Sequence, residues 1–165
     1  MDFNSLESIN NEGFTGFKKT KELWLDKSCI PKERGVYFVL NPDYLNFSFI
    51  NPGVGGFFKG KDPNVSETIL LEKYIEDSQV VYIGKAGSPT GNATLNSRLG
   101  QYLRFGQTKN VGHWGGRYIW QLQNHAELIF CWKPTPNEDP RIVETYYINL
   151  FKNQFGTLPF ANLTN

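Results

Sequence analysis

Glu144 is the acidic residue whose position in the sequence most clearly predicts chemistry. In a helix over residues 140–155, Glu144 falls in the middle of an arc of apolar positions. The arc consists of Val143, Tyr147, Ile148, Phe151 and Phe155. Burying an unpaired carboxylate there costs several kcal/mol. We therefore expect Glu144 to face a cation, a basic side chain or a cleft.

Arg98 is the basic residue expected to share a cleft with such a carboxylate. Arg98 and Tyr102 are four positions apart, so in a helix they project from one side, as residues at the rim of a cleft would. They flank an apolar stripe formed by Leu95, Leu99 and Leu103. The alternative is purely structural, with Arg98 and Glu144 simply pairing with each other.

The charge of the chain is unevenly distributed. Its 17 Lys and Arg nearly balance 16 Asp and Glu, and the net charge of +1 excludes a protein coated with positive charge. Residues 78–126 contain no acid and carry +5, whereas the rest of the chain carries −4. This segment predicts a local phosphate-binding surface, unless folding scatters its charges over several faces. Its basic residues are Lys85, Arg98, Arg104, Lys109 and Arg117.

The sequence His113-Trp114-Gly115-Gly116-Arg117 is a second candidate for substrate contact. The two glycines let the backbone approach another group closely, and an arginine is suited to hold a phosphate. His113, Arg117 and the nearby Arg104 are therefore our expected substrate-binding residues. The alternative is a tight turn whose tryptophan packs inside.

Residues 55–61 match the G-x-x-x-x-G-K pattern of a nucleotide-binding loop but lack its context. Asp62 follows where a Ser or Thr hydroxyl is needed, Pro63 comes next, and no strong apolar strand precedes the loop. A Gly-rich turn is the better interpretation. The two histidines and two cysteines likewise show no metal-ligand spacing.

Hydrophobic periodicity and helix-capping residues indicate the elements that must position these groups. Strands are expected over residues 35–40, 79–84, 118–122 and 127–132, and helices over 65–77, 94–105 and 140–155. Thr94 and Asp139 are the expected N-caps of the last two helices, and Gly156 can end the final one. Because the order lacks regular βαβ alternation, an α+β fold is favoured.

Composition and length predict one domain spanning residues 1–165. Hydrophobic residues make up 39% and aromatic residues 15%, which excludes intrinsic disorder. Residues 1–33 read as a polar lead-in, and residues 41–79 as a structured loop or insertion. The longest apolar run is five residues, and no signal-peptide pattern is present, so we expect a soluble cytoplasmic protein. Cys29 and Cys131 are expected to be ordinary core thiols.

In their order along the chain, these residues resemble the GIY-YIG nuclease domain. The motifs are Gly-Val-Tyr at 35–37 and Val-Tyr-Ile-Gly-Lys at 81–85, followed by Arg98, an aromatic four residues later, Glu144, and Pro-x-x-Asn at 159–162. The sequence departs from the family in one respect. The two motif tyrosines are 45 positions apart here, whereas a short spacer separates them in the minimal domain. An insertion over 41–79 that leaves and re-enters the sheet at adjacent strands explains this spacing.

The resemblance implies a small, mainly antiparallel sheet flanked by helices, and an endonuclease that hydrolyses DNA phosphodiesters with one Mg²⁺ or Mn²⁺ ion. Tyr37 would be the general base or orient the water, with Lys85 and the metal favouring its phenolate form. Tyr82 would hydrogen-bond to the same water or phosphate. Arg98 would clamp the scissile phosphate, and Glu144 would hold the metal.

Two further residues complete the expected site. Tyr102 stands where the family has Tyr or His, and Asn162 would orient the site. The alternative is that Tyr82 and Tyr102 are core residues and that Asn162 is solvated. DNA is the expected partner and RNA the alternative substrate, with specificity supplied by loops, a homodimer or a partner protein. The alternative function is a nucleic-acid-binding or partner-recruiting module that keeps the fold with little or no catalysis.

Overall fold

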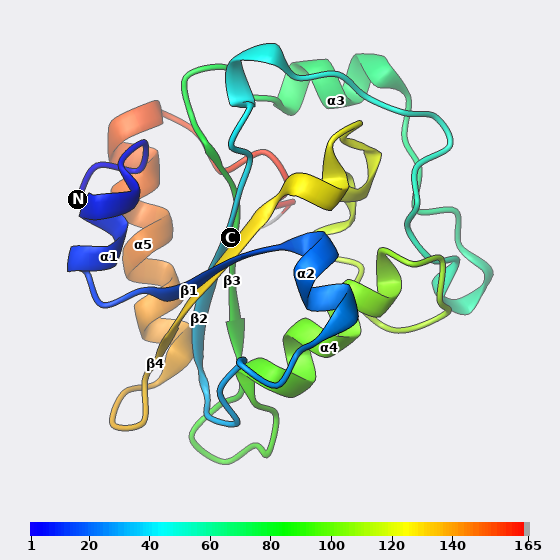
Figure 1. The fold of residues 1–165 in the computed structure, drawn as a ribbon. Helices are drawn as coiled ribbons and strands as arrows, with labels where there is room; N and C mark the ends of the chain where they lie inside the picture. The colour runs from blue at the N-terminus through cyan, green and yellow to red at the C-terminus, as the bar shows by residue number, and fades with distance from the viewer. Residues whose placement is uncertain (164–165) are drawn as a thin grey trace.

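The centre of the molecule is a four-stranded antiparallel sheet with the strand order β1-β4-β2-β3 (Figure 1). The strands are β1 (Thr15–Lys19), β2 (Gly35–Leu40), β3 (Val80–Ala86) and β4 (Ile129–Pro134). This computed structural model describes residues 1–163. The expected α+β class, with an antiparallel sheet flanked by helices, is confirmed. Within the described part of the chain, no helix has the length and apolar character needed to cross a membrane.

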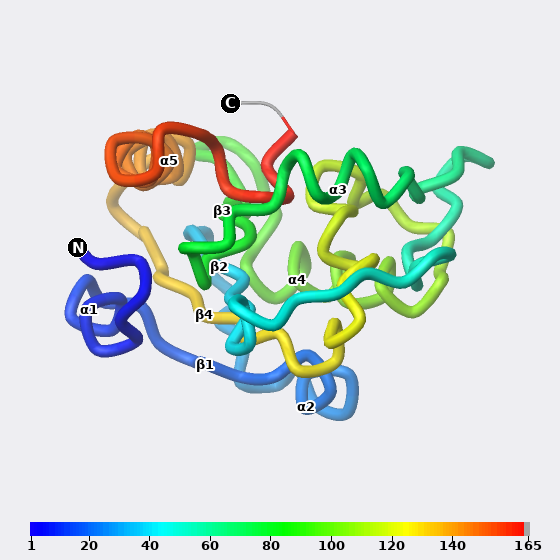
Figure 2. Tube along the Cα trace, turned by 90° about the horizontal axis from the view of Figure 1, so that it is seen from above, coloured from blue at the N-terminus to red at the C-terminus, as the bar shows by residue number. Residues whose placement is uncertain are grey.

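Helices cover both faces of the sheet and enclose two cores. Seen from above, α1 and α5 lie on one side of the strands and α2 and α4 on the other (Figure 2). Val36, Phe38 and Leu40 of β2 join the first core, whereas Tyr37 and Val39 join the second, as the two-residue period of a strand requires. The helices are α1 (Leu6–Asn11), α2 (Thr20–Leu25), α3 (Glu67–Lys73), α4 (Leu95–Phe105) and α5 (Pro140–Phe155).

The helices α4 and α5 begin and end where their capping residues predict. The Thr94 side chain accepts a hydrogen bond from the backbone N–H of Ser97 at the start of α4. Asp139 caps α5 in the same way, and Gly156 follows its last turn with φ of 75°, the left-handed conformation that glycine adopts without strain. These two helices carry Arg98 and Glu144, so their positions fix the functional groups discussed below.

The first 33 residues are part of the fold, and their interpretation as a lead-in is wrong. They contain α1, the sheet strand β1 and α2. β1 was missed because it is a five-residue edge strand, interrupted by a bulge, whose sequence Thr-Gly-Phe-Lys-Lys does not alternate in polarity. Cys29, in the same segment, is exposed, so the expectation of a core thiol holds only for the buried Cys131.

Residues 41–79 leave β2 and return to β3, which are antiparallel neighbours, as expected of an insertion between adjacent strands. The expected strand at 118–122 is instead a 3-10 helix over Arg117–Gln121. The backbone of this segment pairs with the insertion: Ile50 N donates to Gln121 O at 2.8 Å and Val54 N to Trp120 O at 3.0 Å. Its apolar run therefore reflects burial rather than a place in the sheet.

Asn162 holds the outer edge of β3. Its side-chain oxygen accepts a hydrogen bond from Ile83 N at 2.9 Å, and its side-chain nitrogen donates to Ile83 O at 2.8 Å. The neighbouring Ala161 N donates to Val81 O at 2.8 Å. Asn162 is buried and acts on the strand that carries Tyr82, so any influence on the site passes through β3.

Replacing Asn162 with alanine is expected to destabilise the fold. The change leaves the N–H and C=O groups of Ile83 without these partners, which costs about 1–3 kcal/mol of unfolding free energy. Urea denaturation measures the loss, with the exposed Asn153→Ala in α5 as a matched control expected to change stability by less than about 0.5 kcal/mol. Equal stabilities for the two variants would contradict the structural role of Asn162.

Candidate functional site

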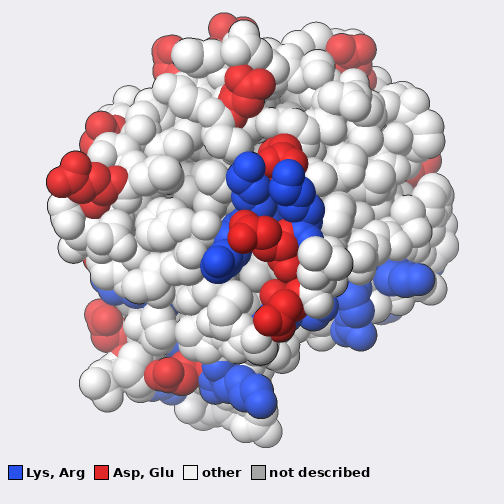
Figure 3. All heavy atoms as spheres, in the orientation of Figure 1, with Lys and Arg blue, Asp and Glu red and all other residues white. Residues whose placement is uncertain are grey.

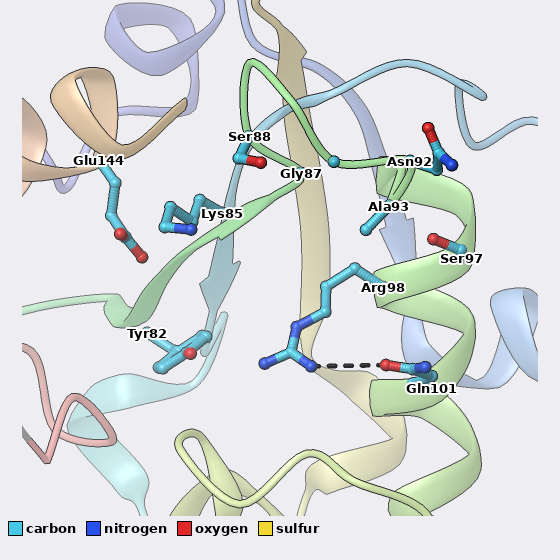
Figure 4. Close-up of a pocket in the computed structure, with 11 residues that line it drawn as sticks. Tyr82, Lys85, Gly87, Ser88, Asn92, Ala93, Ser97, Arg98, Gln101 and Glu144 are labelled. Carbon is cyan, nitrogen blue, oxygen red and sulfur yellow. Dashed lines mark hydrogen bonds between the residues drawn. The ribbon is translucent and has the colours of Figure 1, made fainter. Parts of the chain in front are cut away.

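A cleft of about 520 Å³ lies between β3, the loop that follows it, α4 and α5. Figure 4 shows Lys85 reaching into it from β3, Arg98 from α4 and Glu144 from α5, with Tyr82 beside them. Four of the expected site residues thus line one concave surface, although they span 62 positions of the sequence. Sheet and helix packing brings together a carboxylate, two cations and a phenol.

Glu144 is a partly buried carboxylate without an ion-pair partner. Burial raises the pKa of Glu144, while the positive charges of Lys85, Arg141 and Arg98 act in the opposite direction. Among residues 1–163, the ion pairs within 4.0 Å involve other side chains, so the structural alternative of a direct pair with Arg98 is not found. A desolvated carboxylate of this kind is suited to bind a cation in the cleft.

Arg98 is held in place by neutral acceptors. Its Nη1 donates to Gln101 Oε1 at 3.4 Å and to the backbone oxygen of Gly112 at 3.3 Å (Figure 4). Both acceptors are uncharged, so the positive charge of the guanidinium remains available to an anion. Gln101 was not among the predicted site residues, although its position three residues after Arg98 on the helix was a usable signal.

Tyr37 lies behind the cleft and is fully buried. Its ring packs against that of Tyr82 at a centroid distance of 6.0 Å, and its hydroxyl is 3.1 Å from His113 Nε2. Gly84 makes this position possible, because a Cβ there would lie 2.6 Å from Tyr37 Cζ. Burial is the main cause that raises the pKa of Tyr37 well above its usual value, and burial also raises that of Tyr82 to about 12. These shifts oppose the expected phenolate form of Tyr37.

Tyr102 and His113 form a stacked pair in the interior. Their ring centroids are 3.6 Å apart with an interplanar angle of 5°, and Tyr102 Oη donates to Gly116 O at 2.5 Å. Tyr102 is therefore not at the rim of the cleft, and the buried His113 does not form a substrate-contacting surface, which corrects both expectations. Gly116 has no room for a side chain, because a Cβ would lie 2.2 Å from the Tyr102 hydroxyl.

The two arginines expected to bind substrate lie outside the cleft. Arg117 is partly buried, with its guanidinium 4.4 Å from the ring centroid of Trp114 and 5.0 Å from that of Tyr118. Arg104 is exposed near the C-terminal end of α4. The glycine-rich turn before Arg117 therefore mainly serves internal packing, whereas Arg104 is free to meet an external partner.

The loop that closes the cleft contributes small polar groups that the sequence did not indicate. Ser88 and Asn92 line the cleft beside Gly87 and Gly91. Gly87 has φ of 83°, and a Cβ there would lie 2.5 Å from Ala93 O. The contact between Tyr37 and His113 was missed because it joins residues 76 positions apart and has no periodic signal.

No protein-family model, curated protein or solved structure matches this chain.

His113 is expected to make stability depend on pH. Burial, and secondarily the charge of Arg98, lowers its pKa well below the usual 6.5. As pH falls below 6.5, the unfolded chain binds a proton at this histidine and the folded chain does not. Its contribution is therefore fully present above pH 6.5 and is lost on acidification by about 1.4 kcal/mol per pH unit.

The stability advantage of the wild type over His113→Phe should therefore shrink as pH falls from about 6.5 to about 5.5. Phenylalanine keeps an aromatic ring beside Tyr102 but cannot titrate. Urea denaturation of both proteins at several pH values measures the difference. Stability curves that stay parallel across this range would show that His113 is not held neutral by burial.

Proposed function

We propose that the protein is a metal-dependent endonuclease that hydrolyses phosphodiester bonds in DNA at the cleft between α4 and α5. The observation that carries this proposal is the convergence of Arg98, Lys85 and the unpaired carboxylate of Glu144 on one open surface. Cations are needed to bind a phosphodiester anion, and a carboxylate is needed to hold a divalent ion beside it. The resemblance of the motif residues to the GIY-YIG nuclease domain supports the same reaction.

The phosphate would bind to the basic side of the cleft. Arg98 presents two or more N–H groups in a planar fork that matches two phosphoryl oxygens, and its contacts with Gln101 and Gly112 fix its direction. Lys85 adds a second positive charge from β3. As the attacking water oxygen bonds to phosphorus, its proton passes to solvent in the cleft. The ester P–O bond breaks, and the leaving oxygen takes a proton from the same solvent. Both cations would stabilise the charge that builds up on the phosphoryl oxygens.

The residues of the cleft fit a magnesium ion held mainly by Glu144. Mg²⁺ prefers oxygen and commonly uses one or two carboxylates together with waters and substrate phosphate oxygens. In the part of the chain that the structure describes, no three His, Cys, Asp or Glu residues are grouped to hold a metal, so substrate and water would complete its coordination. When bound, the ion polarises the phosphoryl group and increases the acidity of the attacking water.

Tyr82 would orient the water or the phosphate through its hydroxyl, which stays protonated because burial raises its pKa to about 12. Tyr37 and His113 would act as positioning residues, since they support the Tyr82 ring from within the core. Tyr37 is a poor candidate for the general base because its hydroxyl is removed from solvent. This same observation favours the second candidate function, a nucleic-acid-binding module with little or no catalysis.

Cleavage of supercoiled plasmid in Mg²⁺ or Mn²⁺ tests the two functions. We expect Arg98→Ala and Glu144→Gln to lower the cleavage rate by about 10²–10³-fold, because Arg98 would stabilise the transition state directly and Glu144 would hold the ion that does so. Glu72→Gln, at an exposed position of α3, is the matched control and should cleave like the wild type.

Cleavage that persists in both cleft variants would exclude this site as its source. A wild type that binds DNA but releases no more ends than the two variants would instead support the binding module.

A further inference from the structure

A second groove lies beside the cleft on the exposed side of α4. It has a volume of about 310 Å³, and Ser97 and Gln101 line both hollows, so the two are neighbours on this helix. The groove is lined by Lys27, Asn96, Ser97, Gly100, Gln101 and Arg104. It lies outside the set of residues assigned above to phosphodiester hydrolysis.

The groove is positively charged. Lys27 and Arg104 contribute its charges, no Asp or Glu lines it, and within residues 1–163 neither cation forms an ion pair. On the face shown in Figure 3, basic side chains lie at the lower right. By contrast, the basic cluster at the centre of that view is mixed with acids. The groove is therefore suited to an anion.

Hydrogen bonds fix the shape of the groove. Asn96 Nδ2 donates to Lys27 O at 3.1 Å and to Ile30 O at 3.3 Å, so the segment that carries Lys27 is tied to α4. Gly100 leaves the surface of the helix open, since a Cβ added there meets no atom within 4 Å. One cation thus comes from α4 and the other from a segment anchored to it.

The two arginines of α4 are separated by more than one nucleotide of a polynucleotide strand. Arg98 and Arg104 are six residues apart, which is about 9 Å along the helix axis and about 240° around it. A nucleic-acid strand advances about 3.4 Å per nucleotide, so a phosphate two or three nucleotides from the one at Arg98 would reach Arg104. A mononucleotide or a small diester is too short to occupy both positions.

We propose that the Lys27–Arg104 groove binds a second backbone phosphate, two or three nucleotides from the scissile one. The inference rests on the proposed function and defines its substrate class as a polynucleotide strand. The contact recognises the phosphodiester backbone without reading its bases. The groove increases affinity and places the strand in the cleft, whereas the reaction itself takes place at Arg98, Lys85 and Glu144.

Fluorescence anisotropy with a short labelled DNA duplex, in EDTA so that cleavage does not interfere, tests the groove. We expect the double variant Lys27→Ala/Arg104→Ala to lower the magnitude of the slope of log K against log salt by about 1, because the contact with one phosphate is lost. The matched control is Lys73→Ala/Lys152→Ala, which removes two cations near the ends of α3 and α5 and should leave the slope unchanged.

A second pair of variants separates charge from shape. Gly100→Glu and Gly100→Gln have similar size, and both residues favour a helix more than glycine does, so both variants should fold. We expect Gly100→Glu to bind DNA at least several-fold more weakly than Gly100→Gln, because only the carboxylate repels a phosphate.

The outcomes separate this inference from the proposed function. Hydrolysis of bis(p-nitrophenyl) phosphate needs only the cleft, so it should be unchanged in Lys27→Ala/Arg104→Ala and reduced in Arg98→Ala. If the double variant keeps the wild-type salt slope while Arg98→Ala weakens DNA binding, the groove proposal is overturned and the proposed function stands. If the wild type binds neither DNA nor RNA and does not hydrolyse the diester, the proposed function itself fails.

Discussion

The pairing of Tyr37 with Gly84 across β2 and β3 is the contact on which the site depends. It places a buried aromatic ring over a residue that has no side chain, next to the tyrosine that reaches the cleft. His113 contacts the ring from one loop, and Asn162 fixes the adjacent strand from the C-terminal segment. Because interiors are close-packed, a shift in any of these contacts moves Tyr82. The geometry of the cleft is therefore determined by packing behind it.

The electrostatics of the cleft reflect a competition between burial and charge. Burial favours the neutral form of Glu144, whereas the nearby cations favour its carboxylate. If a phosphate anion entered beside Arg98 and Lys85, as the proposed function requires, it would neutralise part of that favourable charge, and a divalent ion would offset this loss.

Local signals in the sequence predicted the parts of the structure that depend on local interactions. Thr94 and Asp139 predicted the starts of α4 and α5, and the helical period placed Arg98 and Glu144 on surfaces that the fold then brings together. Features that depend on distant contacts were missed. β1 pairs with β4 more than 100 positions away, and the contact between Tyr37 and His113 depends on a loop that no period describes. Residue type alone therefore indicated the cleft but not which aromatic residues face it.

The bonding of the insertion to the segment at 117–122 has a consequence for the boundaries of the domain. Residues 50–54 supply backbone partners to Trp120 and Gln121, and Gly56 packs so closely on Lys109 that a Cβ would lie 1.9 Å from its carbonyl oxygen. Removing residues 41–79 would leave the carbonyl groups of Trp120 and Gln121 without these hydrogen-bond donors. It would also open the core beside Trp120. The segment joins two adjacent strands, but it also covers part of the core. A shorter chain without it would need a redesigned surface where the segment now packs.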